Sequence, residues 1–399
     1  MKNLIDKIRE LTKKEYPEVL KIRRYIHQNP ELSFHEKETS ALIENELNKL
    51  NIQYKKNIAG YGIVAKIEGG GKGKVVGLRA DMDALPLQEK NDISYSSKNK
   101  GIMHACGHDA HTAMMLGVAR VLVQIRHQLN GIVLLIFQPA EEKIPGGAKQ
   151  MIDEGAFKDI TPDLIIGQHV LPEMNVGHVG TRKGPYMAST DEIYLTVKGK
   201  GGHGGMPDLN VDSVLMAAQI IVSLQQIVSR NAPPSVPTVL SFGKIIGNGA
   251  TNILPDEVKI EGTFRSMDEQ WRQKAHDRIT ETAKHIAQSM GGDCDVKVMK
   301  GYPVLVNHEE AGDFCIEGMK QILDKDNFEN LDVRMTAEDF SYYSSVCPSF
   351  FYRLGTGNVK KETHKPLHSS RFNIDEEAMK TGVEVMSWLA VKYLLQFGD

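Results

Sequence analysis

The chain has 399 residues, 41% of them hydrophobic and 25% charged, and its formal net charge is -3. A length above roughly 250–300 residues predicts two domains, because single hydrophobic cores stop growing near that size. The near-balanced charge, with no basic stripe, argues against nucleic-acid binding, and no apolar run approaches the ~18 residues of a membrane span. The N-terminus lacks the apolar region of a secretory signal and the four cysteines form no disulfide framework, so we expect a cytoplasmic protein.

The first half of the chain begins with helical periodicity and continues as alternating strands and helices. Residues 17–50 show the helical pattern, and Pro17 suits the first turn of a helix. Short runs rich in Val, Ile and Leu then alternate with helical stretches such as residues 112–129. Such runs are typical of strands buried on both faces of a mainly parallel sheet. They cover residues 62–68, 74–80, 131–138 and 163–170.

The pattern changes between residues 186 and 300. This stretch reads as strand, helix, two adjacent strands, helix and strand, which is the split βαβ or ferredoxin-like arrangement. Strand–helix alternation resumes after it. We therefore expect one discontinuous α/β domain made of residues 1–185 and 301–399, with residues 186–300 inserted as a second domain.

Metal-type side chains follow four of the predicted strands or their exits. In open α/β sheets, ligands bind beyond the carboxyl ends of the strands. The chain could therefore gather these side chains in one crevice, together with "MHACGHDAH" (103–111). The residues expected to gather are Asp83, Glu141, Glu142, His169 and His368, and Asp81 precedes Asp83 after the same strand.

Each of these residues has an ordinary explanation when it is taken alone. A histidine after a strand is more often packed than metal-bound, paired glutamates usually form a solvated turn, and a lone Cys106 is usually a small core residue. Their occurrence at several strand ends favours a metal site instead. Cys, His and Glu together suit Zn, Mn, Ni or Co better than Mg or Ca. A redox role for Cys106 is weakly supported, because the chain contains no C-x-x-C pair.

One glycine-rich segment imitates a nucleotide-binding motif. "GKGGHG" (199–204) fits the dinucleotide fingerprint G-x-G-x-x-G and lies between a predicted strand and a predicted helix. However, it belongs to the split βαβ region, and the residue about 20 positions further on is Leu224 rather than an acid. We therefore do not expect nucleotide binding.

Eight motifs in chain order resemble the aminoacylase/carboxypeptidase family of two-metal metallohydrolases. Within that family the chain is most similar to the amidohydrolases that include hippurate hydrolases, indole-acetyl-amino-acid hydrolases and N-acyl-amino-acid deacylases. The resemblance implies a zinc-peptidase-like α/β catalytic domain with a mainly parallel sheet, plus an inserted ferredoxin-like lid and dimerisation domain. The motifs are "RRYIHQNPELSFHE" (23–36), "GLRADMDALP" (77–86), "MHACGHDAH" (103–111), "FQPAEE" (137–142), "GGHGGMPD" (201–208), "TNILPDEVKIEGTFR" (251–265), "AEDFSYY" (337–343) and "PLHSSRFNIDEEA" (366–378).

The resemblance also implies roles for residues of the catalytic domain. Glu141 would be the general base, and Asp83 would orient a metal ligand. Asp81 stands where the wider family has a histidine ligand, so its role stays open. Two divalent ions per subunit (Zn, Mn, Ni or Co) are expected. Their ligands would be Cys106, His108, Glu142, His169 and His368.

Three further residues are implied for the lid. Asn252 and Arg265 would hold the substrate's carboxylate, for which the planar fork of arginine is well suited. His203 would reach the partner subunit's active site, bind substrate there and help stabilise the oxyanion. The resemblance therefore implies a homodimer, and leaves a homotetramer open.

The function expected from these residues is hydrolysis of N-acyl-L-amino acids, with acetyl, benzoyl or similar acyl groups, to a carboxylic acid and an amino acid. A dipeptidase or carboxypeptidase of the same family is the alternative. A non-catalytic binding homologue is disfavoured, because a pure binder has no need of a general base such as Glu141 beside a metal ligand.

Overall fold

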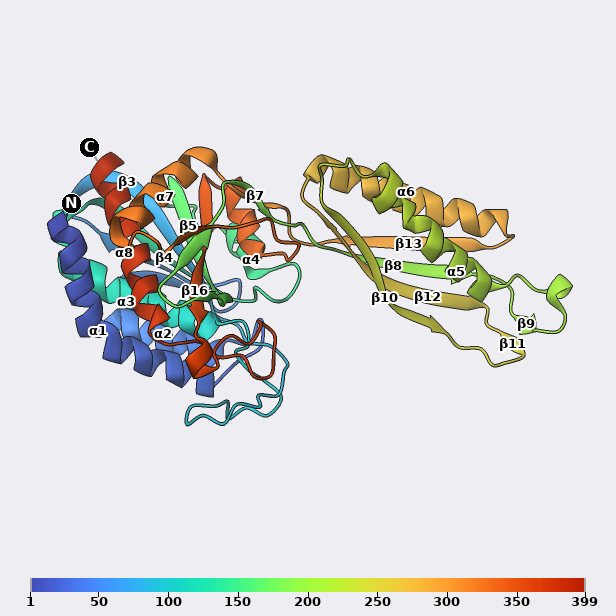
Figure 1. Cartoon of the computed structure of the whole chain (residues 1–399), viewed down its shortest axis with the longest axis horizontal. Helices are drawn as coiled ribbons and strands as arrows, with labels where there is room; N and C mark the ends of the chain where they lie inside the picture. The colour runs from blue at the N-terminus through green and yellow to red at the C-terminus, as the bar shows by residue number, and fades with distance from the viewer. Residues whose placement is uncertain (1, 398–399) are drawn as a thin grey trace. The chain divides into compact units, whose positions relative to one another are not determined.

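The computed structural model describes residues 2–397, and the chain divides into two compact units. Unit 1 comprises Met1–Gly184, Val306–Asp332 and Tyr342–Asp399, and unit 2 comprises Pro185–Leu305 and Val333–Ser341 (Figure 1). The segment Val333–Ser341 lies outside the range 186–300 expected for the inserted domain. Hydrophobic patterning gives no signal for such a short return of the chain.

Unit 1 is built on an eight-stranded sheet with the order β1-β2-β4-β3-β5-β16-β6-β15. The central strands β4, β3, β5 and β16 run parallel to one another, whereas β2 runs antiparallel to both of its neighbours, β1 and β4. This confirms the predicted α/β fold with a mainly parallel sheet. The strands are β1 (Gln53–Ile58), β2 (Gly62–Glu68), β3 (Gly71–Asp81), β4 (Asn130–Gln138), β5 (Leu164–Asn175), β6 (Val179–Thr181), β15 (Phe328–Asn330) and β16 (Ser349–Gly357).

Helices accompany this sheet, and the first of them corrects an expectation. Helix α1 begins at Lys2, and Pro17 lies inside it rather than in its first turn. Proline removes one backbone hydrogen bond, but apolar residues before and after Pro17 are buried, so tertiary packing keeps the helix continuous. The helices of unit 1 are α1 (Lys2–Gln28), α2 (Lys37–Lys49), α3 (His108–Ile125), α4 (Gly147–Asp153), α7 (Glu309–Ile322) and α8 (Ala378–Phe397).

Unit 2 contains a four-stranded antiparallel sheet with the order β10-β12-β8-β13 and two helices. Along the chain the order is β8, α5, β10, β12, α6 and β13, which is the order expected from the sequence. The apolar sides of the sheet and helices form a separate core that includes Trp271 and Phe264. The elements are β8 (Asp191–Lys198), α5 (Ser213–Leu224), β10 (Thr238–Gly247), β12 (Glu257–Ser266), α6 (Glu269–Ser289) and β13 (Asp293–Lys300).

Several short elements complete the chain. The strands β9 (Gly202–His203) and β11 (Ile253–Leu254) pair with each other in unit 2. The remaining short elements are β7 (Gly184–Met187), β14 (Leu305–Asn307), four 3₁₀ segments (Arg126–Gln128, Pro207–Leu209, Asp339–Ser345 and Val359–Lys361) and a π-helical turn (Ile227–Asn231).

The segment Ser213–Asn231 is the one stretch of the described chain long and apolar enough to cross a membrane, by length and composition alone. This segment is longer than the uninterrupted apolar runs of the sequence, from which no membrane span was expected. Helix α5, which forms most of it, buries Met216, Ala217 and Ile220 against the core of unit 2. Helices that cover a core pass the same test, so this segment is weak evidence for a membrane span.

Candidate metal centre

Acidic and imidazole side chains stand at the ends of neighbouring parallel strands of unit 1. Strand β3 ends at Asp81, with Asp83 two residues later, and Glu141 and Glu142 follow the end of β4. His169 lies within β5, which pairs with β3 on its other side. Parallel neighbours end on the same edge of the sheet, so this topology gathers the side chains there.

The turn into α3 places two more donors at this edge. Gly107, just before the helix, has φ 89°, and a Cβ atom there would lie 2.4 Å from a methyl carbon of Val170. Only glycine fits both restrictions. The turn leaves Cys106 Sγ 3.3 Å from His169 Nε2 and places His108 at the start of α3.

The donor atoms form overlapping groups whose members all lie within 4.8 Å of one another. One group is Cys106, His108 and His169, a second is Cys106, Glu142 and His368, and a third is His108, Glu141 and Glu142. The Oε1 atom of Glu142 lies 3.1 Å from His368 Nε2 and 4.0 Å from His108 Nε2. We call these residues the donor cluster: Cys106, His108, Glu141, Glu142, His169 and His368.

Two histidines of the donor cluster are held in the tautomer that a metal ligand requires. His169 Nδ1 is 2.7 Å from the Val170 carbonyl, so Nδ1 carries the proton and Nε2 keeps its lone pair. His108 Nδ1 is 3.1 Å from Asp83 Oδ1, while its buried Nε2 has no hydrogen-bond partner among the described residues. A carboxylate or carbonyl behind the ring is the usual arrangement of a metal-binding histidine.

The electrostatics of the donor cluster also fit a cation. Burial, followed by Glu142 and Glu141, raises the pKa of Cys106 well above its usual value. Burial alone would lower the pKa of His108, but Asp81 and Asp83 outweigh it and raise that pKa to about 10. The His108 shift and the smaller contributions of Glu142 and Glu141 to the Cys106 shift reflect a buried negative field, which a divalent cation would neutralise.

Asp81, whose role the sequence left open, lies 3.7 Å from His108 Nε2 and hydrogen-bonds to two residues outside the donor cluster. The Val170 N–H donates to His111 Nε2 at 3.0 Å, so the proton of His111 is on Nδ1, which donates to Asp81 Oδ1 at 2.6 Å. Arg79 Nη1 donates to Asp81 Oδ2 at 2.5 Å. The sequence placed the segment 103–111 in the expected crevice but assigned no role to His111, which lies three residues after His108 on one helix.

The expected lid residues all lie in unit 2. His203 in β9 pairs with Ile253 in β11, and the Gly204 N–H donates to the carbonyl of Asn252, so His203 and Asn252 are close neighbours. Arg265 lies near the C-terminal end of β12, whereas β11 precedes the start of that strand. Burial lowers the pKa of Arg265, and its Nη1 has no partner among the described residues.

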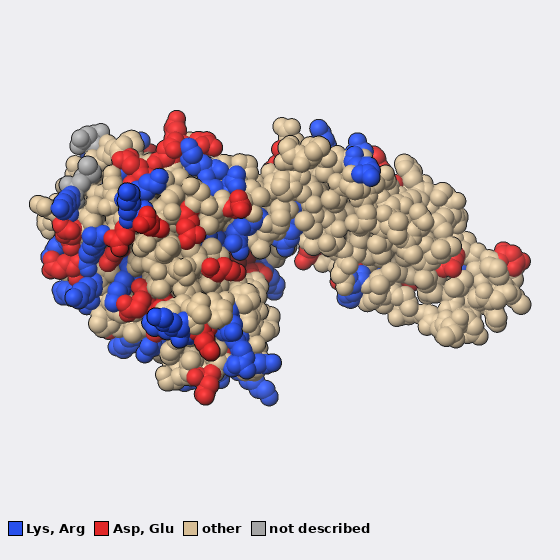
Figure 2. Space-filling view, viewed as in Figure 1, with Lys and Arg blue, Asp and Glu red and all other residues tan. Residues whose placement is uncertain are grey.

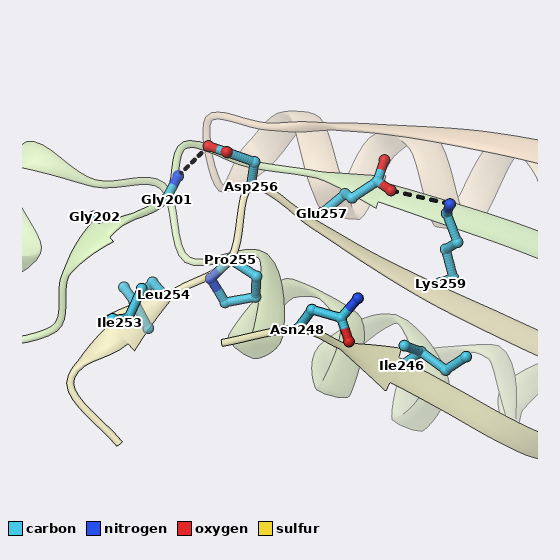
Figure 3. Close-up of a pocket in the computed structure, with 10 residues that line it drawn as sticks. All are labelled: Gly201, Gly202, Ile246, Asn248, Ile253, Leu254, Pro255, Asp256, Glu257 and Lys259. Carbon is cyan, nitrogen blue, oxygen red and sulfur yellow. Dashed lines mark hydrogen bonds and ion pairs between the residues drawn. The ribbon is translucent and has the colours of Figure 1, made fainter. Parts of the chain in front are cut away.

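A pocket of about 460 Å³ lies beside the β9–β11 pair, and Figure 3 shows its lining. Its charged groups are already paired: Asp256 accepts from the Gly201 N–H at 2.9 Å, and Glu257 lies 3.1 Å from Lys259. The next helix, α5, is capped by Asp212, a carboxylate that would repel phosphate. The N-terminus of the helix that follows the "GKGGHG" segment is therefore occupied by the Asp212 carboxylate.

Comparison with known proteins agrees with the geometry of unit 1. The profile described as Peptidase family M20/M25/M40 matches residues 77–392. Thermostable carboxypeptidase 2 of Saccharolobus solfataricus is 40% identical over 394 residues, which cover 98% of this chain and 99% of that protein. The N-acetyl-L-cysteine deacetylase of Bacillus subtilis is 39% identical over 365 residues, covering 91% of this chain and 85% of that protein.

A solved structure gives the same result for the fold. A dinuclear metal-binding peptidase of the M20 family from Bacillus subtilis superposes with a TM-score of 0.82 and 32% sequence identity, covering 96% of this chain and 99% of that one. Together with the donor cluster, these matches identify a metal-dependent hydrolase of peptide or amide bonds that uses divalent ions. The chain belongs to peptidase family M20.

Proposed function

We propose that this enzyme hydrolyses N-acyl-L-amino acids to a carboxylic acid and an amino acid. The observation that carries the proposal is the position of Glu141 and Glu142 within 4.8 Å of His108. One carboxylate can bind a cation while its neighbour moves a proton. A relative with this chemistry in its name, the N-acetyl-L-cysteine deacetylase, aligns over 91% of the chain.

The donor cluster divides into ligands and a base in this proposal. Two divalent ions (Zn, Mn, Ni or Co), when bound, would polarise the amide carbonyl and acidify water. Glu141, which is 7% exposed, takes the proton of the attacking water and returns it to the departing amine. Asp83 holds the His108 ring through Nδ1. The ligands are Cys106, His108, Glu142, His169 and His368.

Residues of unit 2 would recognise the substrate. The Nη1 of Arg265, which has no partner within residues 2–397, suits a substrate carboxylate, and Asn252 would add a hydrogen bond to it. His203, which is exposed in β9, would bind substrate and stabilise the oxyanion in the partner's active site.

A panel of substrates tests the proposal. Purified enzyme loaded in turn with Zn, Mn, Co or Ni is offered N-acetyl- and N-benzoyl-amino acids, dipeptides, and acyl-amino acid amides that lack the carboxylate. We expect the acyl-amino acids to give the highest kcat/KM and the amides to be poor. A higher kcat/KM for the dipeptides would instead favour the peptidase alternative, which the similarity to a carboxypeptidase supports.

A homodimer formed through unit 2 is the second part of the proposal, with a tetramer left open. Helix α5 exposes Leu215 (57%) and Val222 (68%), and the edge strand β10 exposes Ile245 (55%). Exposed apolar side chains beside an unpaired strand edge are typical of a surface covered by a partner. Leu215→Glu should yield monomers in analytical ultracentrifugation, whereas the exposed Val359→Glu in unit 1 should leave the sedimentation unchanged.

A cytoplasmic location completes the proposal. All four cysteines are unpaired, and a reducing compartment would keep Cys106 available as a ligand.

A further inference from the structure

Three successive backbone N–H groups after β4 are held by two buried carboxylates. The Ala140 N–H donates to Glu36 Oε1 at 2.8 Å, the Glu141 N–H to Asp83 Oδ1 at 3.1 Å, and the Glu142 N–H to Asp83 Oδ2 at 3.0 Å. Ala140 has φ 52°, a left-handed conformation that costs free energy in any residue with a Cβ atom. The turn that carries Glu141 and Glu142 is therefore held in place from outside.

The Glu36 carboxyl group interacts with backbone N–H groups, which include those of Phe34 and Glu36 itself as well as that of Ala140. Glu36 lies immediately before α2, but its side chain makes no capping hydrogen bond to that helix. It is fully buried, and its Oε2 has no hydrogen-bond partner among the described residues. A buried carboxyl group in this state costs free energy. Burial, followed by Asp83, raises the pKa of Glu36 to about 7, which records that cost.

Ser33, from the same segment, supports the second carboxylate. Its hydroxyl donates to Asp83 Oδ2 at 2.6 Å. Ser33 and Glu36 thus act on the Ala140–Glu142 turn from one short stretch, which contributes no donor of its own to the cluster.

We propose that Glu36 is a positioning residue, which sets the Glu141–Glu142 pair by holding the Ala140 N–H in the left-handed turn. This inference rests on the proposed metal-dependent function. Glu36 touches neither the substrate nor a metal ion. Its effect on the turn passes through the hydrogen bond to the Ala140 N–H, so any side chain that offers an oxygen acceptor at the same place should replace it.

Two substitutions of nearly equal size distinguish the effect of the oxygen acceptor from the effect of side-chain volume. Glu36→Gln keeps an oxygen at Oε1, whereas Glu36→Met fills the same space without an oxygen. We expect Glu36→Gln to retain kcat within about 3-fold and Glu36→Met to lose about 10–100-fold in kcat or in metal affinity, as is usual for groups that orient ligands. KM should change less than kcat, because the turn carries the proposed base.

Cobalt binding supplies a readout that does not depend on substrate. Apoprotein is titrated with Co²⁺, and the visible spectrum reports the ligand geometry. Glu36→Gln should reproduce the wild-type spectrum and affinity, and Glu36→Met should bind more weakly with an altered spectrum. The matched control is Glu46→Met, since Glu46 is a buried glutamate of α2 that pairs with Arg120 and Lys49 instead. It should lower stability and leave the spectrum and kcat unchanged.

The outcomes distinguish failure of the proposed function from failure of the positioning role of Glu36. Wild-type protein that binds no Co²⁺ would overturn the proposed function itself. Wild-type spectrum and kcat in Glu36→Met, or equal losses in Glu36→Gln and Glu36→Met, would overturn the positioning role alone. If Glu36→Met does not fold, the double variant with Ala140→Gly is measured, because glycine lowers the cost of φ 52°. That variant should show a measurable kcat, and a folded double variant with no measurable kcat would also overturn the positioning role.

Discussion

The two units place their charged and apolar side chains in opposite ways. Unit 1 encloses charged groups completely, among them Arg23, Arg79, Asp81 and Asp109. Unit 2 has a largely apolar core and exposes large apolar side chains on α5 and β10. Figure 2 adds a difference in surface charge on the visible faces: many Lys, Arg, Asp and Glu side chains cover unit 1, whereas fewer lie on the part bearing α5.

The contrast indicates a different role for each unit. Buried charge costs free energy and persists where it positions reactive groups, as in the carboxylates behind the donor cluster. Exposed apolar surface persists where another surface covers it. The contrast is what the proposed functions require: chemistry in the interior of unit 1 and association at the surface of unit 2.

The largest effect should come from the donor cluster. Glu141→Gln keeps the shape of the side chain but removes the proposed base, so kcat should fall by about 10²–10⁴ while metal content stays near that of wild type. Steady-state kinetics and elemental analysis measure the two quantities. Wild-type turnover in this variant would show that another residue is the base.

The second effect concerns stability of unit 1. Arg23 is fully buried and donates to Asp109 at 2.8 Å, to Glu376 at 2.9 Å and to Asn373 at 3.0 Å. Arg23→Met leaves those acceptors buried, so the free energy of unfolding should fall by about 3–5 kcal/mol in urea denaturation. Arg24→Met is the matched control: Arg24 also binds Glu376 but is 43% exposed, and we expect a loss below about 1 kcal/mol.

The fold of unit 1 and its candidate site could be predicted to different depths. Buried apolar runs indicated the parallel sheet, and ligand-type residues after those runs indicated the site, because both signals are local. The start of α1 was predicted wrongly, since the packing that carries the helix through Pro17 is tertiary. The motif at residues 23–36 was noticed, but the role of Glu36 is visible only when residues 104 positions apart meet.

The smallest effect tests a buried charge in unit 2, the unit that otherwise has few. Asp191 accepts from Arg272 Nη2 at 2.5 Å and lies 2.8 Å from His276 Nε2. Burial raises the pKa of Asp191, but the bonds to Arg272 and His276 outweigh burial and lower that pKa below its ordinary value. The stabilisation by ionised Asp191 should therefore be complete above about pH 4 and be lost as the pH falls through the lowered pKa.

Asp191→Asn should cost about 1.5–3 kcal/mol at pH 7, the usual net value of hydrogen bonds to a charged group, and the gap to wild type should close in acid. Trp271 and Trp388 are the two tryptophans of the chain, so in a Trp388→Phe background the fluorescence of Trp271 reports unit 2 alone. Asp295→Asn, at an exposed pair with Lys198, is the control and should stay within about 1 kcal/mol of wild type. A gap between Asp191→Asn and wild type that is constant across this pH range would mean that Asp191 acts through packing, and unit 2 would then derive no stability from buried charge at this site.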